Sequence, residues 1–355
     1  MLKNYGWTLS RQRALASLAA SEHQPARVTI QHRGRYEIVC DDGHYAATLA
    51  GRLMHEAGDG ALPVTGDFVA VSLRPSERAA TIHAVLPRET VFARKEAGGH
   101  ARQIVAANVD VAFLVMAMNA DFNPRRLERY LALARESGAR PLVLLSKSDL
   151  AGDGAAQIDA VRAIAHGVTV LALSAVTGDG VDAVAREILP GETAVVLGSS
   201  GAGKSTLVNA LLGEARMVTQ AISAHLDKGR HTTTHRELVL LPSGGLILDT
   251  PGMRELGLTD ASSGIEAAFA DIAALAAQCR FRDCTHEREP GCAVQAAIEA
   301  GDLATARLKS MRKLEREAAR FEIAEDPLAR QVQRRLWAQR GKAAKARMKA
   351  KYGDD

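Results

Sequence analysis

The clearest chemistry in this sequence lies in a glycine-rich loop between an apolar run and a helical pattern. The run Thr193–Leu197 precedes the loop, and the pattern Thr206–Leu212 follows it. The fixed positions of a phosphate-binding P-loop are all present across Gly198, Ser199, Ser200, Gly201, Ala202, Gly203, Lys204 and Ser205. Backbone N–H groups would surround phosphate oxygens, and the lysine would add charge beside the β- and γ-phosphates. We therefore predict a polyphosphate site from Gly198 to Thr206, with Ser205 as a Mg²⁺ ligand; the alternative is an ordinary glycine turn.

Two further strands end in residues that suit recognition of a guanine base. Ser146-Lys147-Ser148-Asp149 follows the apolar run Pro141–Leu145, where GTPases carry an [N/T]KxD signature. In that signature the Asp149 carboxylate would accept from guanine N1–H and N2–H₂, and the Lys147 stem would cover the base. The run Val168–Leu173 ends at Ser174-Ala175, where GTPases present a backbone turn to guanine O6. The alternative is a pair of βα turns with ordinary capping residues.

Two loops after the P-loop are candidates for contacts with Mg²⁺ and the γ-phosphate. The run Gly229–Thr234 precedes a strand, in the place where a switch loop supplies a threonine hydroxyl to Mg²⁺, and Thr233 or Thr234 is the candidate. Asp249-Thr250-Pro251-Gly252 follows a second strand, so Asp249 could hold Mg²⁺ through water and the Gly252 N–H could contact the γ-phosphate. The alternative for a threonine run is a set of side-chain turns.

The group that orients the attacking water is not obvious, because Met253 stands where many GTPases carry a glutamine. A thioether cannot align water, so we expect slow intrinsic hydrolysis. His231, in the same loop as the threonines, is the candidate for this role, although a loop histidine is usually only solvated.

Three of the four cysteines cluster with a histidine. The spacing Cys279-x₄-Cys284-x-His286-x₅-Cys292 supplies three thiolates and one imidazole, a closed tetrahedral set for Zn²⁺. Four filled positions leave none for water, so this metal would be structural. The alternative, buried cysteines beside a chance histidine, is disfavoured by the charged residues around them.

The order of these elements along the chain is unusual for a GTPase. The base-reading residues Asp149 and Ser174 precede the P-loop, whereas they normally follow it. We therefore predict a circularly permuted α/β P-loop domain. Permutation would lead the switch region directly into whatever follows Gly252.

Patterning divides the 355 residues into five parts. Short alternating strands separated by turns predict an oligonucleotide-binding type of β-barrel, whose basic and aromatic side chains would face RNA or only solvent. A mainly helical zinc-binding domain follows the α/β domain. The expected division is a leader at 1–26, the barrel at 27–100, the GTPase domain at 101–260, the zinc-binding domain at 261–325 and a basic extension at 326–355.

Charge and hydropathy limit the possible partners. The net charge is only +4, yet nine basic residues and no acidic one lie between Arg330 and Lys351, which favours a polyanionic partner. No apolar run is long enough to cross a bilayer, and the Ala-rich stretch after Arg13 is short for a secretory signal. We expect a monomeric cytoplasmic protein without a membrane partner.

Together these motifs resemble the RsgA (YjeQ) family of circularly permuted bacterial GTPases, over roughly residues 27 to 320. The resemblance rests on Ser146–Asp149, Gly198–Ser205, Gly229–Thr234, Asp249–Gly252 and the cysteine cluster. It implies GTP hydrolysis stimulated by the 30S ribosomal subunit, contact with 16S ribosomal RNA, and release on hydrolysis late in subunit maturation. GTP or GDP, Mg²⁺ and one structural Zn²⁺ are the implied ligands. Ser146 departs from the usual asparagine, and the family pattern does not fix the role of the long basic extension after Asp326.

Two other functions remain open from the sequence. One is an RNA-binding assembly factor in which the nucleotide is structural and is not turned over. The other is a P-loop ATPase or kinase, for which ATP would compete with GTP as well as GDP does.

Overall fold

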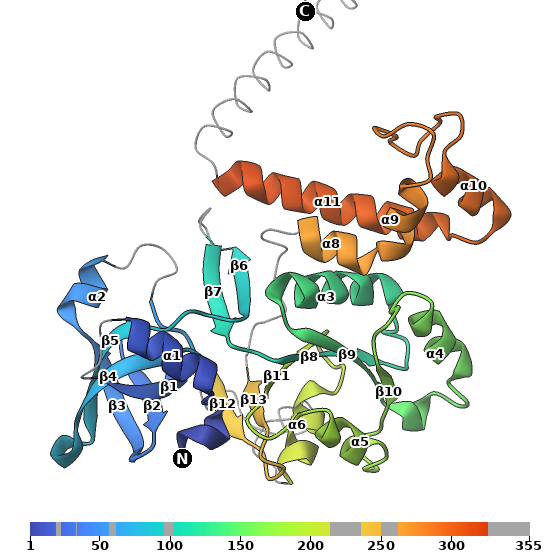
Figure 1. The fold of residues 1–355 in the computed structure, drawn as a ribbon. Helices are drawn as coiled ribbons and strands as arrows, with labels where there is room; N and C mark the ends of the chain where they lie inside the picture. The colour runs from blue at the N-terminus through green and yellow to red at the C-terminus, as the bar shows by residue number, and fades with distance from the viewer. Residues whose placement is uncertain are drawn as a thin grey trace, which may run out of the picture.

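The computed structural model describes residues 1–18, 23–32, 34–56, 62–95, 102–213, 236–249 and 262–325 (Figure 1). Every helix, strand and contact of the fold given below belongs to these residues. The predicted glycine and threonine run at 229–234, the Thr250–Gly252 turn and the extension from 326 to 355 lie outside them.

The N-terminal part is a closed barrel of five strands. They are β1 (Gln24–Gln31), β2 (Tyr36–Cys40), β3 (Gly43–Leu49), β4 (Phe68–Arg74) and β5 (Ala79–Val85). The order β1-β2-β3-β5-β4 closes because β4 also pairs with β1, and β3 runs parallel to β5. Alternate residues such as Val28, Ile38 and Val69 are buried inside, as the period-2 pattern predicts. Between these strands lie α2 (Gly51–Glu56) and the 3₁₀ turn η2 (Pro75–Glu77).

The N-terminal segment packs on the barrel, which its weak periodicity does not indicate. It forms a 3₁₀ turn, η1 (Leu2–Tyr5), and α1 (Leu9–Ser17). Leu2 is fully buried and the Trp7 ring lies 5.7 Å from that of Phe68, centroid to centroid. The segment therefore shares the core although it contains no strand.

The central part is an α/β sheet in the order β10-β9-β8-β11-β13-β12. Its strands are β8 (Val111–Ala117), β9 (Arg140–Ser146), β10 (Val170–Ala172), β11 (Thr193–Gly198), β12 (Glu237–Leu240) and β13 (Leu246–Asp249). All neighbouring pairs are parallel except β12 with β13. The β6–β7 hairpin (Val91–Lys95 and Arg102–Ala107) stands between the barrel and this sheet, and it spans the domain boundary expected near residue 100.

Helices cover both faces of the central sheet. On one face, α3 (Pro124–Ser137) and α4 (Ala155–Arg162) pack on residues such as Leu114 and Val143; on the other, α5 (Val181–Arg186) and α6 (Lys204–Leu212) pack on Phe113 and Leu144. The near-continuous apolar strands follow from this burial on two faces. A further 3₁₀ turn, η3 (Ser148–Leu150), follows β9.

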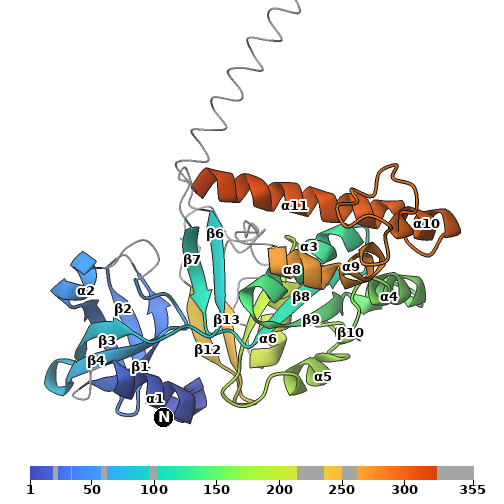
Figure 2. The same cartoon turned by 45° about the horizontal axis from the view of Figure 1, so that its top comes forward.

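The C-terminal part, called the helical unit below, consists of α8 (Ser262–Ala268), α9 (Ala270–Ala276), α10 (Ala293–Ala300) and α11 (Thr305–Glu325). Figure 2 shows α8 against α3, with α11 lying along the outside of both. The predicted fold class is thus confirmed: an N-terminal barrel, a permuted α/β GTPase-like core and a helical C-terminal part.

Candidate nucleotide site

The predicted nucleotide-binding loops meet at one edge of the central sheet. Strands β8, β9, β10, β11 and β13 are parallel, so their carboxyl ends lie together. Ligands of open α/β sheets bind in the crevice outside these ends. Ser146 ends β9, Ser174 follows β10 and Gly198 ends β11, so elements in permuted order along the chain share one edge.

The P-loop leaves β11 in close contact with β8. A Cβ on Gly198 would lie 2.5 Å from the Val115 carbonyl oxygen, so only glycine fits there. Gly203 has a φ of 88° and precedes the first residue of α6, Lys204. The Lys204 ammonium donates to the carbonyl oxygens of Gly198 and Ser199, at 2.9 Å and 2.5 Å. The loop therefore wraps back over its own lysine, with the helix N-terminus directed into the loop.

Ser146 links the predicted base-reading strand to the P-loop. Its side chain is buried, and its hydroxyl donates to the Ala202 carbonyl oxygen at 2.6 Å. Ser146 thus has a defined contact in the position where the family carries asparagine. A serine hydroxyl can make this bond because it needs only one donor.

The residues after Ser146 form a tight turn that exposes Asp149. Lys147 has a left-handed φ of 62°, and Asp149 lies exposed in η3. The turn is bonded to the next strand end, because the Ser148 N–H donates to the Leu173 carbonyl at 3.1 Å.

The Ser174 turn is held by its own hydrogen bonds. Ser174 is buried, its N–H donates to the Asp179 carbonyl at 2.9 Å, and its hydroxyl accepts from the Thr177 N–H at 3.3 Å. Ala175, partly buried, follows it at the sheet edge. Both base-reading candidates therefore belong to loops that are bonded to the sheet end.

Several predicted residues cannot be placed in this site. His231, Thr233, Thr234 and Gly252 lie outside the described residues. The backbone of Asp249 ends β13 beside β11, which brings it to the same edge as the P-loop. Their roles stay predictions.

Asp121 is a site residue that sequence reasoning missed. It follows β8, and its carboxylate accepts from the Ser199 hydroxyl of the P-loop and from Arg126 Nη1, the latter at 2.8 Å. The Arg126 guanidinium, and after it the Ser199 hydroxyl, lower the pKa of Asp121 and keep it charged. An acidic residue beside a phosphate loop has no motif, so its position after the strand next to β11 was the only signal in the sequence.

The Cys₃His cluster is a second, separate site, in the loops between α9 and α10. The ligand atoms of Cys279, Cys284, His286 and Cys292 all lie within 4.8 Å of one another. Cys279 Sγ lies 3.9 Å from Cys292 Sγ, and His286 Nδ1 lies 3.6 Å and 3.5 Å from these two sulfurs.

These distances fit a tetrahedral Zn²⁺ ion. Bond lengths of about 2.3 Å to sulfur and 2.0–2.1 Å to nitrogen imply a sulfur–sulfur separation of about 3.8 Å and a sulfur–nitrogen separation of about 3.5 Å. The Gln295 N–H, in the first turn of α10, donates to Cys292 Sγ at 3.4 Å and holds this sulfur in place. The Gln295 side chain also donates to the His286 carbonyl and fixes the histidine backbone. The four residues are therefore compatible with one zinc ion.

Comparison with known proteins gives concordant matches. A model of the RsgA GTPase family matches residues 85–259. A small ribosomal subunit biogenesis GTPase RsgA of Opitutus terrae is 46% identical, with 99% of each chain covered. The protein of the same name from Streptomyces coelicolor is 47% identical, with 99% of this chain and 96% of its own covered.

Two solved structures are similar in fold. YjeQ from Thermotoga maritima has a TM-score of 0.64 and 25% identity, covering 84% of this chain and 99% of its own. YloQ, described as a circularly permuted GTPase, has a TM-score of 0.59 over 84% of this chain and 95% of its own, at 23% identity. The likeness to YloQ concerns the fold alone.

Proposed function

Because this chain belongs to the RsgA GTPase family, we propose that it is a GTP hydrolase acting in biogenesis of the small ribosomal subunit. The observation that carries the proposal is the bond between Ser146 and Ala202. It joins the loop that would read the base to the loop that would hold the phosphates. The simplest reason for a direct hydrogen bond between these two loops is that they bind the same nucleotide.

The phosphates would be bound by the backbone of Gly198–Ser205 and by the Lys204 ammonium, with Thr206 extending the contacts. Ser205, Asp249 and either Thr233 or Thr234 would hold Mg²⁺, which supplies charge neutralisation to the β- and γ-phosphates when bound. The Gly252 N–H would contact the γ-phosphate. In this arrangement His231 orients the attacking water, because Met253 cannot.

Guanine would be recognised by hydrogen bonds that adenine cannot make. The Asp149 carboxylate accepts from N1–H and N2–H₂, while the backbone of Ser174-Ala175 donates to O6. Lys147 covers one face of the base with its aliphatic stem. Ser146 would preserve this geometry by fixing the turn to the P-loop, so its replacement of asparagine does not by itself remove selectivity.

The proposed partner is the 30S subunit, contacted as a monomer through 16S ribosomal RNA. The curated relatives are named small ribosomal subunit biogenesis GTPases. The basic extension from Arg330 to Lys351 would neutralise RNA phosphates, and the zinc ion would hold the loop around Cys284 in shape. We propose that the chain is divided into leader, barrel, GTPase domain, zinc-binding domain and extension. The bound nucleotide would determine how tightly the barrel, the GTPase domain and the zinc-binding domain together bind RNA.

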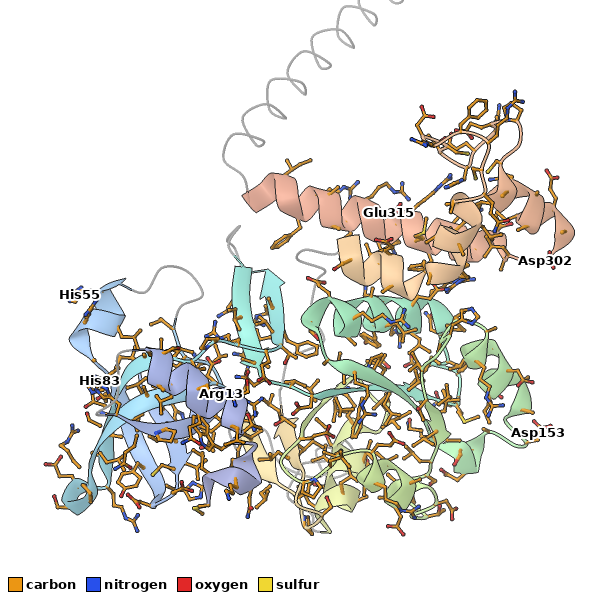
Figure 3. The ribbon with its side chains drawn as sticks, viewed as in Figure 1. Arg13, His55, His83, Asp153, Asp302 and Glu315 are labelled. Carbon is orange, nitrogen blue, oxygen red and sulfur yellow. The ribbon has the colours of Figure 1, made fainter. Side chains whose placement is uncertain are left out.

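The test is nucleotide turnover with GTP and ATP side by side, with and without purified 30S subunits. The proposal expects multiple turnovers of GTP, faster with 30S subunits, and little hydrolysis of ATP. Asp149→Asn should shift the nucleotide preference toward xanthosine triphosphate. The control is Asp153→Asn, which changes an exposed carboxylate in a nearby loop (Figure 3) and should leave the preference unchanged. A single bound GTP that is never turned over would favour an RNA-binding assembly factor. Equal use of ATP would favour a P-loop ATPase.

A further inference from the structure

We propose that Asp121 is a positioning residue of the nucleotide site. Its carboxylate fixes Ser199 in the first half of the P-loop, and through the Ser199 carbonyl it sets the position of Lys204. The inference rests on the proposed function, because it concerns how this loop grips the phosphates of GTP.

The first step is the contact between Asp121 and the loop. One carboxylate oxygen, Oδ2, accepts both the Ser199 hydroxyl and Arg126 Nη1. The Asp121 backbone N–H donates to the Asn119 side chain at 3.0 Å, which holds the turn after β8. The carboxylate therefore has little freedom to leave Ser199.

The second step leads from Ser199 to the lysine. The Ser199 carbonyl accepts from Lys204 Nζ at 2.5 Å. Ser199 therefore binds the Asp121 carboxylate through its hydroxyl and the Lys204 ammonium through its carbonyl oxygen. A lysine ammonium is a point charge at the end of a flexible side chain, so the strength of its interaction with a phosphate depends on where the side chain is positioned. Loss of Asp121 would let Ser199 and the lysine shift together.

The negative charge of Asp121 is paired with Arg126. A carboxylate close to bound polyphosphate would repel it, and the repulsion is reduced here by the ion pair with Arg126. Ser146 fixes the second half of the loop at Ala202, and Asp121 fixes the first half at Ser199. The two contacts act at opposite ends of one loop, so neither can replace the other.

The same carboxylate connects the loop to α3. Arg126 lies in the first turn of this helix. The Asn123 side chain fixes the start of the helix by accepting from the N–H groups of Arg125 and Arg126. Two residues after Arg126, Glu128 accepts from Arg307 of α11 at 3.0 Å. The P-loop is thus tied by Asp121 to the helix on which the helical unit docks.

The test is a double-mutant cycle of Asp121→Ala, Ser199→Ala and the double variant in the full-length protein. Equilibrium dissociation constants for GTP and GDP are measured for each, together with the thermal unfolding midpoint of the nucleotide-free protein. We expect each single variant to weaken GTP binding about tenfold, the value of one hydrogen bond to a charged group. The double variant should bind GTP no more weakly than Asp121→Ala, because both changes break one contact.

Two further variants separate positioning from general damage. Asp121→Asn keeps an acceptor for Ser199 and should recover part of the lost affinity. Asp302→Asn changes an exposed carboxylate between α10 and α11 (Figure 3) and should leave affinity unchanged.

Two outcomes would overturn the inference while leaving the proposed function intact. One is additive losses in the cycle; the other is an unchanged GTP affinity in Asp121→Ala, whether or not its unfolding midpoint is lowered. Failure of the wild-type protein to bind GTP would overturn the proposed function, and this inference with it.

Discussion

The central sheet is joined to its two neighbours in chemically different ways. At the barrel seam, defined by β1, β12 and Arg27, the contacts end on backbone groups. Ile30 of β1 pairs with Glu237 of β12, and the Thr65 hydroxyl donates to the Arg236 carbonyl at 3.2 Å. Arg27 is 1% exposed and donates to carbonyl oxygens of Tyr5, Gly66 and Asn108, at 2.8, 3.1 and 2.9 Å.

At the helical seam, between α3 and the helices α8, α9 and α11, the strongest contacts are ion pairs between side chains. Arg307 is 4% exposed and donates across the seam to Glu128 at 3.0 Å and, within the helical unit, to both oxygens of Asp271 at 2.6 and 2.7 Å. Arg129 makes a bidentate pair with Glu317 at 2.6 and 2.5 Å.

The two seams differ in how many specific side chains they require. At the barrel seam any residue type can supply the backbone acceptors, so only the donor Arg27 is specified, whereas a buried ion pair fails if either of its two side chains is lost. The barrel seam also lies at the start of β12, directly after residues 214–235, which contain the predicted switch loop. The barrel is therefore tied to the strand that leaves that loop, and the helical unit is tied through α3 to the strand end that carries Asp121.

The largest expected effect is that of Arg307→Ala at the helical seam. Glu128 is 1% exposed and would remain as a buried charge paired with Arg125, which is itself partly exposed. Breaking such a pair costs about 3–5 kcal/mol, so the local opening free energy of α9 and α11 should fall by that amount. Hydrogen–deuterium exchange measures this, with the exposed Arg320→Ala on the same helix as control. A loss below about 1 kcal/mol would contradict the contrast between seams.

Arg307 also shows what the sequence could not predict. It belongs to a run of basic residues on one helix with Lys309, Arg312 and Arg316, and the sequence gives no reason to separate it from them. Its acidic partners are 36 and 179 positions away. Only tertiary packing decides that this guanidinium is buried while Lys309 and Arg316 are exposed.

The strands of the central sheet and the nucleotide loops were accessible from sequence, for a physical reason. Strands buried on both faces need continuous apolar runs, and a phosphate loop needs glycines at fixed positions, so β9, β11 and Gly198–Ser205 carry local signals. The Asp121 contact and the burial of Leu2 carry no local motif, because they depend on residues far along the chain. The permuted order was visible because each loop could be identified by itself.

At the barrel seam, Arg27→Met should have the next largest effect. The change keeps the length of the side chain but leaves three carbonyl oxygens without this donor, while it also removes the cost of burying a charge. Burial lowers the pKa of Arg27 to about 9, which leaves it charged at neutral pH. We expect a loss of about 2 kcal/mol in the opening free energy of β1 and β12.

Hydrogen–deuterium exchange of the same two strands checks this prediction, and exchange at α9 should not change. Arg35→Met, on the exposed turn before β2, is the matched control. If α9 opened as readily as β12, the two seams would be one cooperative structure and the comparison would fail.

A smaller effect, dependent on pH, is expected for Asp271→Asn. Burial opposes ionisation of Asp271, yet its hydrogen bonds from Arg307 hold its pKa below the usual value. A carboxyl with a lowered folded pKa stabilises the protein above its unfolded pKa of about 3.9 and loses this contribution as pH falls through the folded value. The wild-type protein should therefore be more stable than Asp271→Asn at pH 7, by about 1–2 kcal/mol.

The difference between Asp271→Asn and wild type should begin to shrink as the pH falls through the unfolded pKa of about 3.9, and it should go on shrinking until the pH passes the lower folded pKa, where the wild-type carboxyl is neutral in the folded protein as well. Thermal unfolding midpoints from pH 6 to pH 3 measure it, with Asp302→Asn as a control that shows no such trend. A difference that stays constant down to pH 3 would mean that the charge of Asp271 does not stabilise the helical seam. The three hydrogen bonds of Arg27 at the barrel seam add no such trend of their own, because carbonyl acceptors do not titrate.

The smallest expected effect separates geometry from burial within the helical seam. Arg129 and Glu317 form a bidentate pair, but their side chains are 29% and 36% exposed, in contrast to 4% and 1% for Arg307 and Glu128. If burial decides the strength of a pair, the cycle of Arg129→Ala and Glu317→Ala should give a coupling energy of at most about 1 kcal/mol. This coupling should fall as ionic strength rises from about 0.1 M to about 1 M, where screening acts over about 3 Å. A coupling that matches the Arg307 pair and resists salt would instead show that bidentate geometry is sufficient, and the helical seam would then be held along its whole length.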